Sequence, residues 1–348
     1  MQVPQCTLYS DNPYHRLLFA ADGRYQPVRS TVADAIEGGG DLLHVHWEEH
    51  VLRDQRTATE AELSADYFIG RLKEFAARGG RIVWTIHNAR PHEGQYMAVF
   101  TRLQVELGRQ CDRVMVHNLE AARIAVEELG VPQSRLYYLP HPSYLGIYEA
   151  EARTAARVRG SDGKRVLLLG KLRRYKGIEF MLEALFPVAS PGEFDVHIAG
   201  ETLPNDEYGQ ELLRLFARYP QVEVDMRRIE DSEIADLVTG ARCVLLPYER
   251  FLTSGVALLA LTFGTPVVAP DTRQLREVLP AAAHEFLFEP SNADDLRAKT
   301  RALIDLSEPR YAQLVESMLQ RAAYLHPSRA AKRLADLYDS VRVQGKGP

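Results

Sequence analysis

The sequence predicts an α/β protein built from two doubly wound domains that face each other across a cleft. With 348 residues, the chain is long enough for two domains. In both halves, short apolar runs alternate with amphipathic stretches of about 10–15 residues, a pattern typical of parallel strands joined by helices. Between the halves, residues 149–164 lose this periodicity and end in Ser-Asp-Gly, which indicates a linker.

The elements follow the chain in order. In the first half we expect strands at 42–47, 81–87, 113–117 and 137–139, and helices at about 60–78, 95–110 and 121–129. In the second half we expect strands at 166–169, 195–199, 222–226, 242–246 and 266–269, and helices at 177–186, 207–218, 231–239, 254–263, about 292–305 and 309–343. The predicted domains are therefore 1–148 and 165–325, with residues 326–348 as a terminal helix.

Composition excludes several classes of protein. The chain is 46% hydrophobic and 26% charged, which is ordinary for a globular protein, and its net charge of -5 argues against a nucleic-acid binder. Cys6, Cys111 and Cys243 are far apart, which argues for a reducing compartment and against a zinc site. We see neither a run of 18 apolar residues nor a signal-peptide pattern, so a cytoplasmic location is expected.

A basic cluster follows the first strand of the second half, in the stretch "VLLLGKLRRYKGIEF". Ligands of parallel sheets bind at the carboxyl ends of strands, and Gly170 and Gly177 let the backbone approach a ligand there. The helix after Gly177 offers free N–H groups to an anion. Arg173 can donate two hydrogen bonds to phosphate oxygens, and Lys176 can act as a point charge. The cluster predicts a diphosphate site, and the alternative is a solvated basic loop.

A second stretch, residues 243–270, predicts another anion-binding helix end. Thr253 or Ser254 would cap the helix that begins near Gly255, so a second helix N-terminus would point into the same region. The alternative is a simple helix cap. In the preceding loop, Glu249 is either an acceptor for ribose hydroxyls or an ordinary surface residue.

These motifs carry a family resemblance. The order of strand, "GKLRRYKG", helix, "HIAG", "EDSEIADLVTGARCVLLPY" and "GTPVVAP" over residues 166–270 resembles the donor half of GT-B glycosyltransferases, which have two Rossmann-like domains. The first half, with "LLHVHW" and "WTIHN", is similar more loosely. The resemblance implies a nucleotide-sugar donor whose diphosphate Arg173 and Lys176 bind, and a final helix that crosses back to the first domain. It also implies that "DMRRIED" meets the nucleobase, with Arg227 and Arg228 stacking on it, unless these residues are only exposed charges.

One departure from the family bears on mechanism. Many retaining members carry two glutamates, eight residues apart, before the Gly-Thr-Pro turn, where this chain has Phe251 and Leu259. With "TIHNARPHE", the sequence looks more like the xanthan-type exopolysaccharide β-mannosyltransferases, which use GDP-mannose and invert. That resemblance implies a polyprenyl-diphosphate-linked oligosaccharide acceptor and peripheral contact with the inner face of the membrane. The alternatives are a retaining transferase that uses a UDP-sugar, a nucleotide-sugar 2-epimerase, and a catalytically silent nucleotide-sugar-binding partner.

Inversion requires a base that takes the proton of the acceptor hydroxyl, and the resemblance implies that the first domain supplies it. The segment 85–94 follows a predicted strand, so its polar residues lie at the ligand-binding edge. Glu93 and His92 are candidates for the base, and His87 is a candidate for it or for a hydrogen bond to the donor. Asn88 is a candidate sugar contact, although it and Pro91 can equally shape a turn.

The segment 44–50, "HVHWEEH", holds further candidates. Trp47 is placed to stack on a sugar, and Glu48 is a candidate contact to the acceptor or sugar. Glu48 or Glu49 is the base if Glu93 is not, whereas His44 fits a structural role in the core. His141, in "PHPSY", either faces the donor or is structural. We find no Asp-x-Asp in a strand-end loop, so neither a metal ion nor a cofactor is predicted, and basic residues with helix dipoles would neutralise the leaving group.

Overall fold

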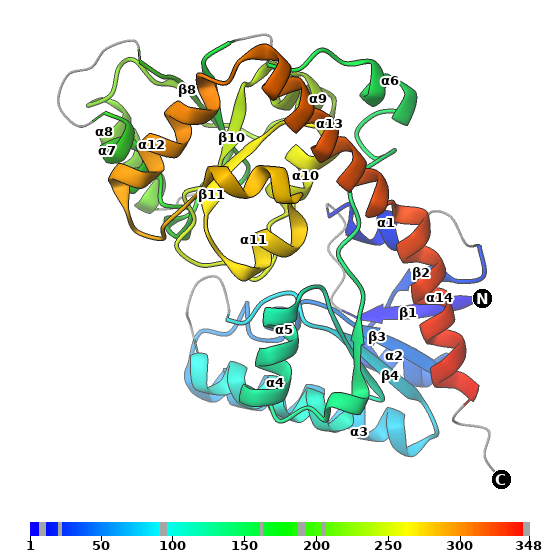
Figure 1. Ribbon diagram of the computed structural model, residues 1–348. Helices are drawn as coiled ribbons and strands as arrows, with labels where there is room; N and C mark the ends of the chain where they lie inside the picture. The colour runs from blue at the N-terminus through cyan, green and yellow to red at the C-terminus, as the bar shows by residue number, and fades with distance from the viewer. Residues whose placement is uncertain are drawn as a thin grey trace. The chain divides into compact units, whose positions relative to one another are not determined.

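The chain divides into two compact units in the computed structural model (Figure 1), which describes residues 1–6, 12–19, 23–90, 96–160, 163–186, 193–202 and 207–343. Unit 1 is Met1–Pro142 with Pro327–Pro348, and unit 2 is Ser143–His326. The division therefore lies before the stretch 149–164 that the sequence suggested as a linker. That stretch contains helix α6 (Glu151–Ala156) and belongs to unit 2.

Unit 1 is built on a parallel sheet whose described strands run in the order β2-β1-β3-β4-β5-β6. The strands are β1 (Gln2–Cys6), β2 (Gln26–Arg29), β3 (Leu42–Val45), β4 (Arg81–Thr85), β5 (Arg113–Val116) and β6 (Leu136–Tyr138). The helices are α1 (Tyr14–Phe19), α2 (Val32–Glu37), α3 (Ala58–Ala77), α4 (Met97–Gln110), α5 (Leu119–Arg123) and α14 (Pro327–Val343). Short turns of other helix types lie at Glu48–Val51, Ile124–Glu128 and Gln133–Arg135.

Unit 2 has a second parallel sheet, in the order β12-β11-β10-β7-β8-β9 for its described strands. These strands are β7 (Arg165–Leu169), β8 (Asp195–Ala199), β9 (Glu223–Asp225), β10 (Cys243–Leu245), β11 (Val267–Pro270) and β12 (Leu287–Phe288). The remaining helices are α7 (Ile178–Leu185), α8 (Glu207–Phe216), α9 (Asp231–Gly240), α10 (Gly255–Phe263), α11 (Arg273–Val278), α12 (Ala293–Ile304) and α13 (Glu308–Tyr324), with 3₁₀ turns at Arg174–Lys176 and Ala281–Phe286. The predicted α/β class with two parallel, doubly wound sheets is confirmed.

Strand order indicates where a ligand site is expected in each unit. A crevice forms at the carboxyl edge of a parallel sheet where the direction of winding reverses. In unit 1 the reversal lies between β1 and β3, and in unit 2 it lies between β7 and β10. Residues that follow these strands are therefore the first candidates for function.

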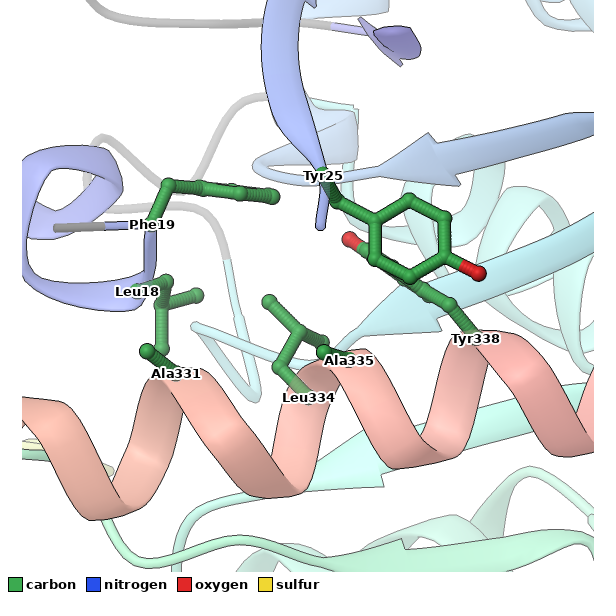
Figure 2. A pocket seen from close by; sticks show the side chains of 7 residues that line it. All are labelled: Leu18, Phe19, Tyr25, Ala331, Leu334, Ala335 and Tyr338. Atoms are coloured by element: carbon green, nitrogen blue, oxygen red, sulfur yellow. The ribbon is translucent and has the colours of Figure 1, made fainter. Parts of the chain in front are cut away.

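The C-terminal part differs from the single helix expected over 309–343. Helix α13 ends at Tyr324 and α14 begins at Pro327, because proline has no amide hydrogen with which to continue a helix. The break coincides with the division between the units, so α14 belongs to unit 1, where it packs against α1. Figure 2 shows a small apolar pocket between them, lined by Leu18, Phe19, Tyr25, Ala331, Leu334, Ala335 and Tyr338.

None of the helices in the described ranges is long and apolar enough to cross a membrane.

Candidate functional site

The basic cluster of unit 2 contains one residue unlike the others. Lys176 follows β7 at the reversal point of the sheet, and only 4% of its surface is exposed. Its Nζ donates a hydrogen bond to the carbonyl of Leu169 at 3.1 Å and lies 5.2 Å from the ring centroid of Tyr248. Burial, and secondarily the charge of Arg173, lowers the pKa of Lys176 to about 7. An ammonium group has three donors, so this one can still bind an anion.

Two glycines keep the backbone close to this lysine. A Cβ added at Gly170, which has φ +100°, would lie 3.1 Å from the Lys176 Nζ. A Cβ added at Gly177, with φ +64°, would lie 2.2 Å from the carbonyl oxygen of Pro247, which belongs to the loop after β10. Only glycine fits both positions, so the loops after β7 and β10 are locked together around Lys176.

The loop after β10 completes this region. Ser254 caps α10 by accepting a hydrogen bond from the amide of Ala257 at 3.1 Å. A Cβ added at Gly170 would also lie 3.5 Å from Val256, so the start of α10 adjoins the same glycine as Lys176. The residues that follow β7 and β10 thus bring a buried cation and a helix N-terminus together, a combination that suits a diphosphate.

The other donor-side candidates lie around this centre or away from it. Arg173 is half-buried and donates to the carbonyl of its neighbour Leu172 at 2.8 Å, and Thr253 is half-buried just before the cap. Glu249 is exposed, and its amide donates to the carbonyl of Tyr175 at 3.0 Å. Arg228 is exposed after β9, which is separated from β7 by β8.

In unit 1, the strand ends gather a cluster of histidines. Its members are His15 on α1, His44 on β3, His46 after β3, His87 after β4, His117 after β5 and His141 after β6, all at most 9% exposed. Tyr14 lies among them, 4.8 Å from the ring of His87 and 5.2 Å from that of His141 by centroids. Its hydroxyl lies 2.8 Å from the Nε2 of His117.

His87 is held on two sides. Its ring stacks on Trp47 with centroids 4.2 Å apart and planes 15° apart, and its Nε2 lies 3.0 Å from the Nδ1 of His46. Trp47 adopts φ 39°, a left-handed conformation that costs a bulky residue about 1 kcal/mol or more. Trp47 is only 7% exposed and one face of its ring covers His87, while its predicted contact with a sugar stays a prediction.

Glu48, next to Trp47 in the sequence, is fully buried. It accepts hydrogen bonds from the indole of Trp84 at 3.0 Å and from the amide of Gln104 at 2.7 Å. Burial, followed by the charge of Glu49, raises the pKa of Glu48 to about 8. Glu48 is therefore held by side chains of unit 1, and its predicted roles as acceptor contact or base stay predictions.

Asn88 and His141 remain at the carboxyl edge of the sheet. Asn88 donates to Glu49 at 2.6 Å, and its carbonyl accepts from Gln104 at 3.1 Å, so the turn after His87 is anchored. His141 donates from Nδ1 to the carbonyl of Pro142 at 2.8 Å. His92 and Glu93 lie outside the described residues, so their candidacy as base stays a prediction.

Sequence reasoning missed Gln5, Tyr14, His15, His117 and Tyr248 as members of these sites. His117 had a usable signal, since it ends a predicted strand. Within the ranges that the structure describes, no group of three or more His, Cys, Asp or Glu side chains has an arrangement that could hold a metal ion.

The buried histidines should make unit 1 sensitive to acid. Burial lowers the pKa of His15 and His141 to about 3 and of His117 to about 4, and it lowers the pKa of His44, His46 and His87 well below the ordinary value. At pH values between these folded-state pKa values and 6.5, the unfolded chain binds more protons than the folded one. The free energy of unfolding is therefore fully retained above pH 6.5 and falls as the pH drops toward 4. We expect a loss of at least about 5 kcal/mol over that range.

Both tryptophans, Trp47 and Trp84, belong to unit 1, so their fluorescence reports this unit alone. Acid titration at equilibrium should change the fluorescence before the far-ultraviolet circular dichroism signal of the whole chain is lost. A fluorescence signal that stays native down to pH 4 would contradict the neutral, buried cluster.

Comparison of the chain with known proteins finds glycosyltransferases. Residues 163–305, within unit 2, match the family model described as "Glycosyl transferases group 1". The chain is 27% identical over 264 residues to the GDP-mannose:glycolipid 4-beta-D-mannosyltransferase of Xanthomonas campestris, covering 74% of this chain and 70% of that one. It is also 27% identical over 222 residues to the glycogen synthase of Pseudomonas fluorescens, covering 60% of this chain and 44% of that one.

Solved structures share the fold over nearly the whole chain. HepE of Anabaena, solved in complex with UDP-glucose, has a TM-score of 0.71 at 14% identity and covers 98% of this chain and 100% of its own. Sucrose-phosphate synthase of Thermosynechococcus elongatus has a TM-score of 0.68 at 17% identity, covering 90% of this chain and 76% of its own.

Proposed function

This chain is a glycosyltransferase with the GT-B fold, and on that premise we propose that it transfers mannose from GDP-mannose to a lipid-linked oligosaccharide, with inversion and without a metal ion. The observation that carries the proposal is the buried Lys176 beside the start of α10. Similarity to the Xanthomonas mannosyltransferase supports mannose, guanosine and a glycolipid acceptor.

The residues of unit 2 would hold the donor by its diphosphate. The Lys176 ammonium would bind one phosphate oxygen, the Arg173 guanidinium another, and the N–H groups at the start of α10 would face the same charge. Negative charge grows on this diphosphate as the bond to the sugar breaks, so these groups stabilise the leaving group most in the transition state. Glu249 and Arg228 would meet the nucleoside.

Two further features support inversion and a lipid acceptor. Phe251 and Leu259 stand where many retaining relatives of this fold carry glutamates, and Leu259 is buried in the core. On α3, Leu63 and Tyr67 are 65% and 68% exposed one turn apart, a surface that would rest on the membrane which holds the acceptor.

A transfer assay tests the proposal. The purified chain would be incubated in EDTA with radiolabelled GDP-mannose or UDP-glucose, and with polyprenyl-diphosphate oligosaccharides extracted from an exopolysaccharide-producing bacterium. We expect label from GDP-mannose in the lipid fraction, with a β anomer by NMR. Label in the lipid fraction from UDP-glucose alone would refute GDP-mannose as the donor, and an α anomer would refute inversion. Binding of GDP-mannose without any transfer would indicate a silent binding partner.

A further inference from the structure

A chain of hydrogen bonds in unit 1 fixes which nitrogen of His87 carries its proton. It starts at Gln5, which is fully buried. The amide nitrogen of Gln5 lies 3.3 Å from the carbonyl of Val3, which can only accept, so this nitrogen donates and the amide oxygen is left for another partner. That partner is His46, whose Nε2 lies 2.9 Å from the Gln5 Oε1.

The next two links follow from the chemistry of neutral imidazole. Since the Gln5 oxygen only accepts, His46 must carry its hydrogen on Nε2 and present a lone pair on Nδ1. The Nε2 of His87, 3.0 Å from this lone pair, must therefore donate to it. A neutral His87 then has its only hydrogen on Nε2, and its Nδ1 is a lone pair without a hydrogen-bonding partner among the described residues.

The C-terminal helix supports the first link. The hydroxyl of Tyr338 on α14 lies 2.6 Å from the Nδ1 of His44, and the Gln5 side chain is near enough to influence the pKa of this phenol. Figure 2 shows Tyr338 at the edge of the pocket between α1 and α14, beside Tyr25. A segment that follows unit 2 in the sequence thus lies beside the amide that orients His46.

We infer that the Nδ1 of His87 is the base that takes the proton of the acceptor hydroxyl, and that Gln5 and His46 are positioning residues that hold His87 in this tautomer. The inference rests on the proposed function. In the step, the proton of the acceptor hydroxyl moves to Nδ1 while the acceptor oxygen bonds to C1 of the sugar. The electron pair of the bond between C1 and the diphosphate oxygen leaves with the diphosphate.

The surroundings of His87 favour a neutral base. The groups that face it are the ring of Trp47, the phenol of Tyr14 and the imidazoles of His15, His44, His46, His117 and His141. Burial, followed by the nearby imidazoles, lowers the pKa of His87. Because the base must be unprotonated, the rate should rise with pH on a limb that lies below pH 6.5 and should be level at neutral pH.

The tautomer can be observed in the unmodified protein. The full chain, labelled with ¹⁵N-histidine, would give long-range ¹H–¹⁵N correlations, and His87→Gln would identify the signals of His87. At pH 7.5 we expect Nε2 protonated and Nδ1 bare. A proton on Nδ1 would overturn the inference, whether or not mannose is transferred, so this result is independent of the proposed function.

Kinetics test the role of the hydrogen-bond relay formed by Gln5, His46 and His87. His87→Gln should lower kcat by about 10²–10⁴-fold with little change in the KM for GDP-mannose. Gln5→Met should lower kcat by about tenfold, because it frees the tautomer. Gln5→Glu should keep the tautomer and move the acid limb of kcat about one pH unit upward, since its charge favours a proton on the relay.

The matched control is Tyr25→Phe, which removes a hydroxyl bonded to Asp339 next to Tyr338 but outside the relay. It should leave the pH profile unchanged. Full activity of His87→Gln, or an unmoved acid limb in an active Gln5→Glu protein, would overturn the assignment. A wild type that transfers no mannose from GDP-mannose would instead refute the proposed function.

Discussion

Replacing Lys176 by methionine should make the empty protein more stable while abolishing efficient use of the donor. The side chain is 4% exposed, and burial lowers its pKa to about 7, so the fold opposes its charge. Methionine fills a similar volume without charge, and we expect a gain of about 0.5–2 kcal/mol in the free energy of unfolding. Loss of the charge-assisted bond to the diphosphate should lower kcat/KM by about 10- to 150-fold.

The gain in stability from Lys176→Met should depend on pH. The folded pKa lies below the unfolded value, so the unfolded state binds more protons between about pH 7 and 10.5, and stability rises with pH over that range. The advantage of Lys176→Met should be largest below pH 7 and vanish above 10.5. The control is Lys164→Met, which changes an exposed lysine just before the amino end of β7. A Lys176→Met protein that is less stable and equally active would contradict the assignment.

Gly177→Ala should destabilise unit 2 strongly. The added Cβ would lie 2.2 Å from the carbonyl oxygen of Pro247, and the residue has φ +64°, which disfavours a side chain. Because backbone must move to relieve the clash, we expect a loss of about 3 kcal/mol or more in the free energy of unfolding. The same movement displaces Lys176, so donor binding should weaken too.

Gly70→Ala is the matched control, for which we expect a change in stability of the opposite sign. Gly70 lies inside α3, where an added Cβ meets nothing within 4 Å, so alanine should stabilise unit 1 by about 0.5–1 kcal/mol. In urea, Gly177→Ala should shift the circular dichroism transition more than the tryptophan fluorescence, which reports unit 1 only. Equal effects of the two substitutions on stability would show that the loops are not locked at Gly177.

Most of the fold could be predicted from the sequence because its strands are buried on both faces. Continuous apolar runs such as β3 and β7 are therefore distinct from the amphipathic helices between them. The first strand, β1, was missed because its residues "QVPQC" mix glutamines and a proline with two apolar side chains. Without it, the point where the first sheet reverses its winding could not be located.

The two candidate sites differ in how well they can be predicted from the sequence. The candidate diphosphate site is predicted from two motifs, at residues 166–180 and 243–270, but which of its basic residues is buried can be seen only in the structure. Arg174 is exposed and paired with Glu211 at 2.7 Å, whereas Lys176 is buried. The histidine cluster draws its six members from five separate segments of the chain, and only the order of the strands brings these segments together. A tautomer relay depends on which atom faces which, which no spacing in the sequence encodes.

The measurement that tests the central claim most directly is the melting temperature of the wild type and of Lys176→Met with GDP, GDP-mannose, UDP and UDP-glucose at pH 6.5 and 8.5. A ligand at 100 times its Kd stabilises the fold by about 2.7 kcal/mol. We predict that GDP and GDP-mannose raise the melting temperature of the wild type, more at pH 6.5 because Lys176 must be charged to bind phosphate, and leave the variant unchanged. A larger rise in melting temperature with UDP or UDP-glucose would contradict GDP-mannose as the donor. An equal rise in Lys176→Met would contradict the role of Lys176 in binding the diphosphate.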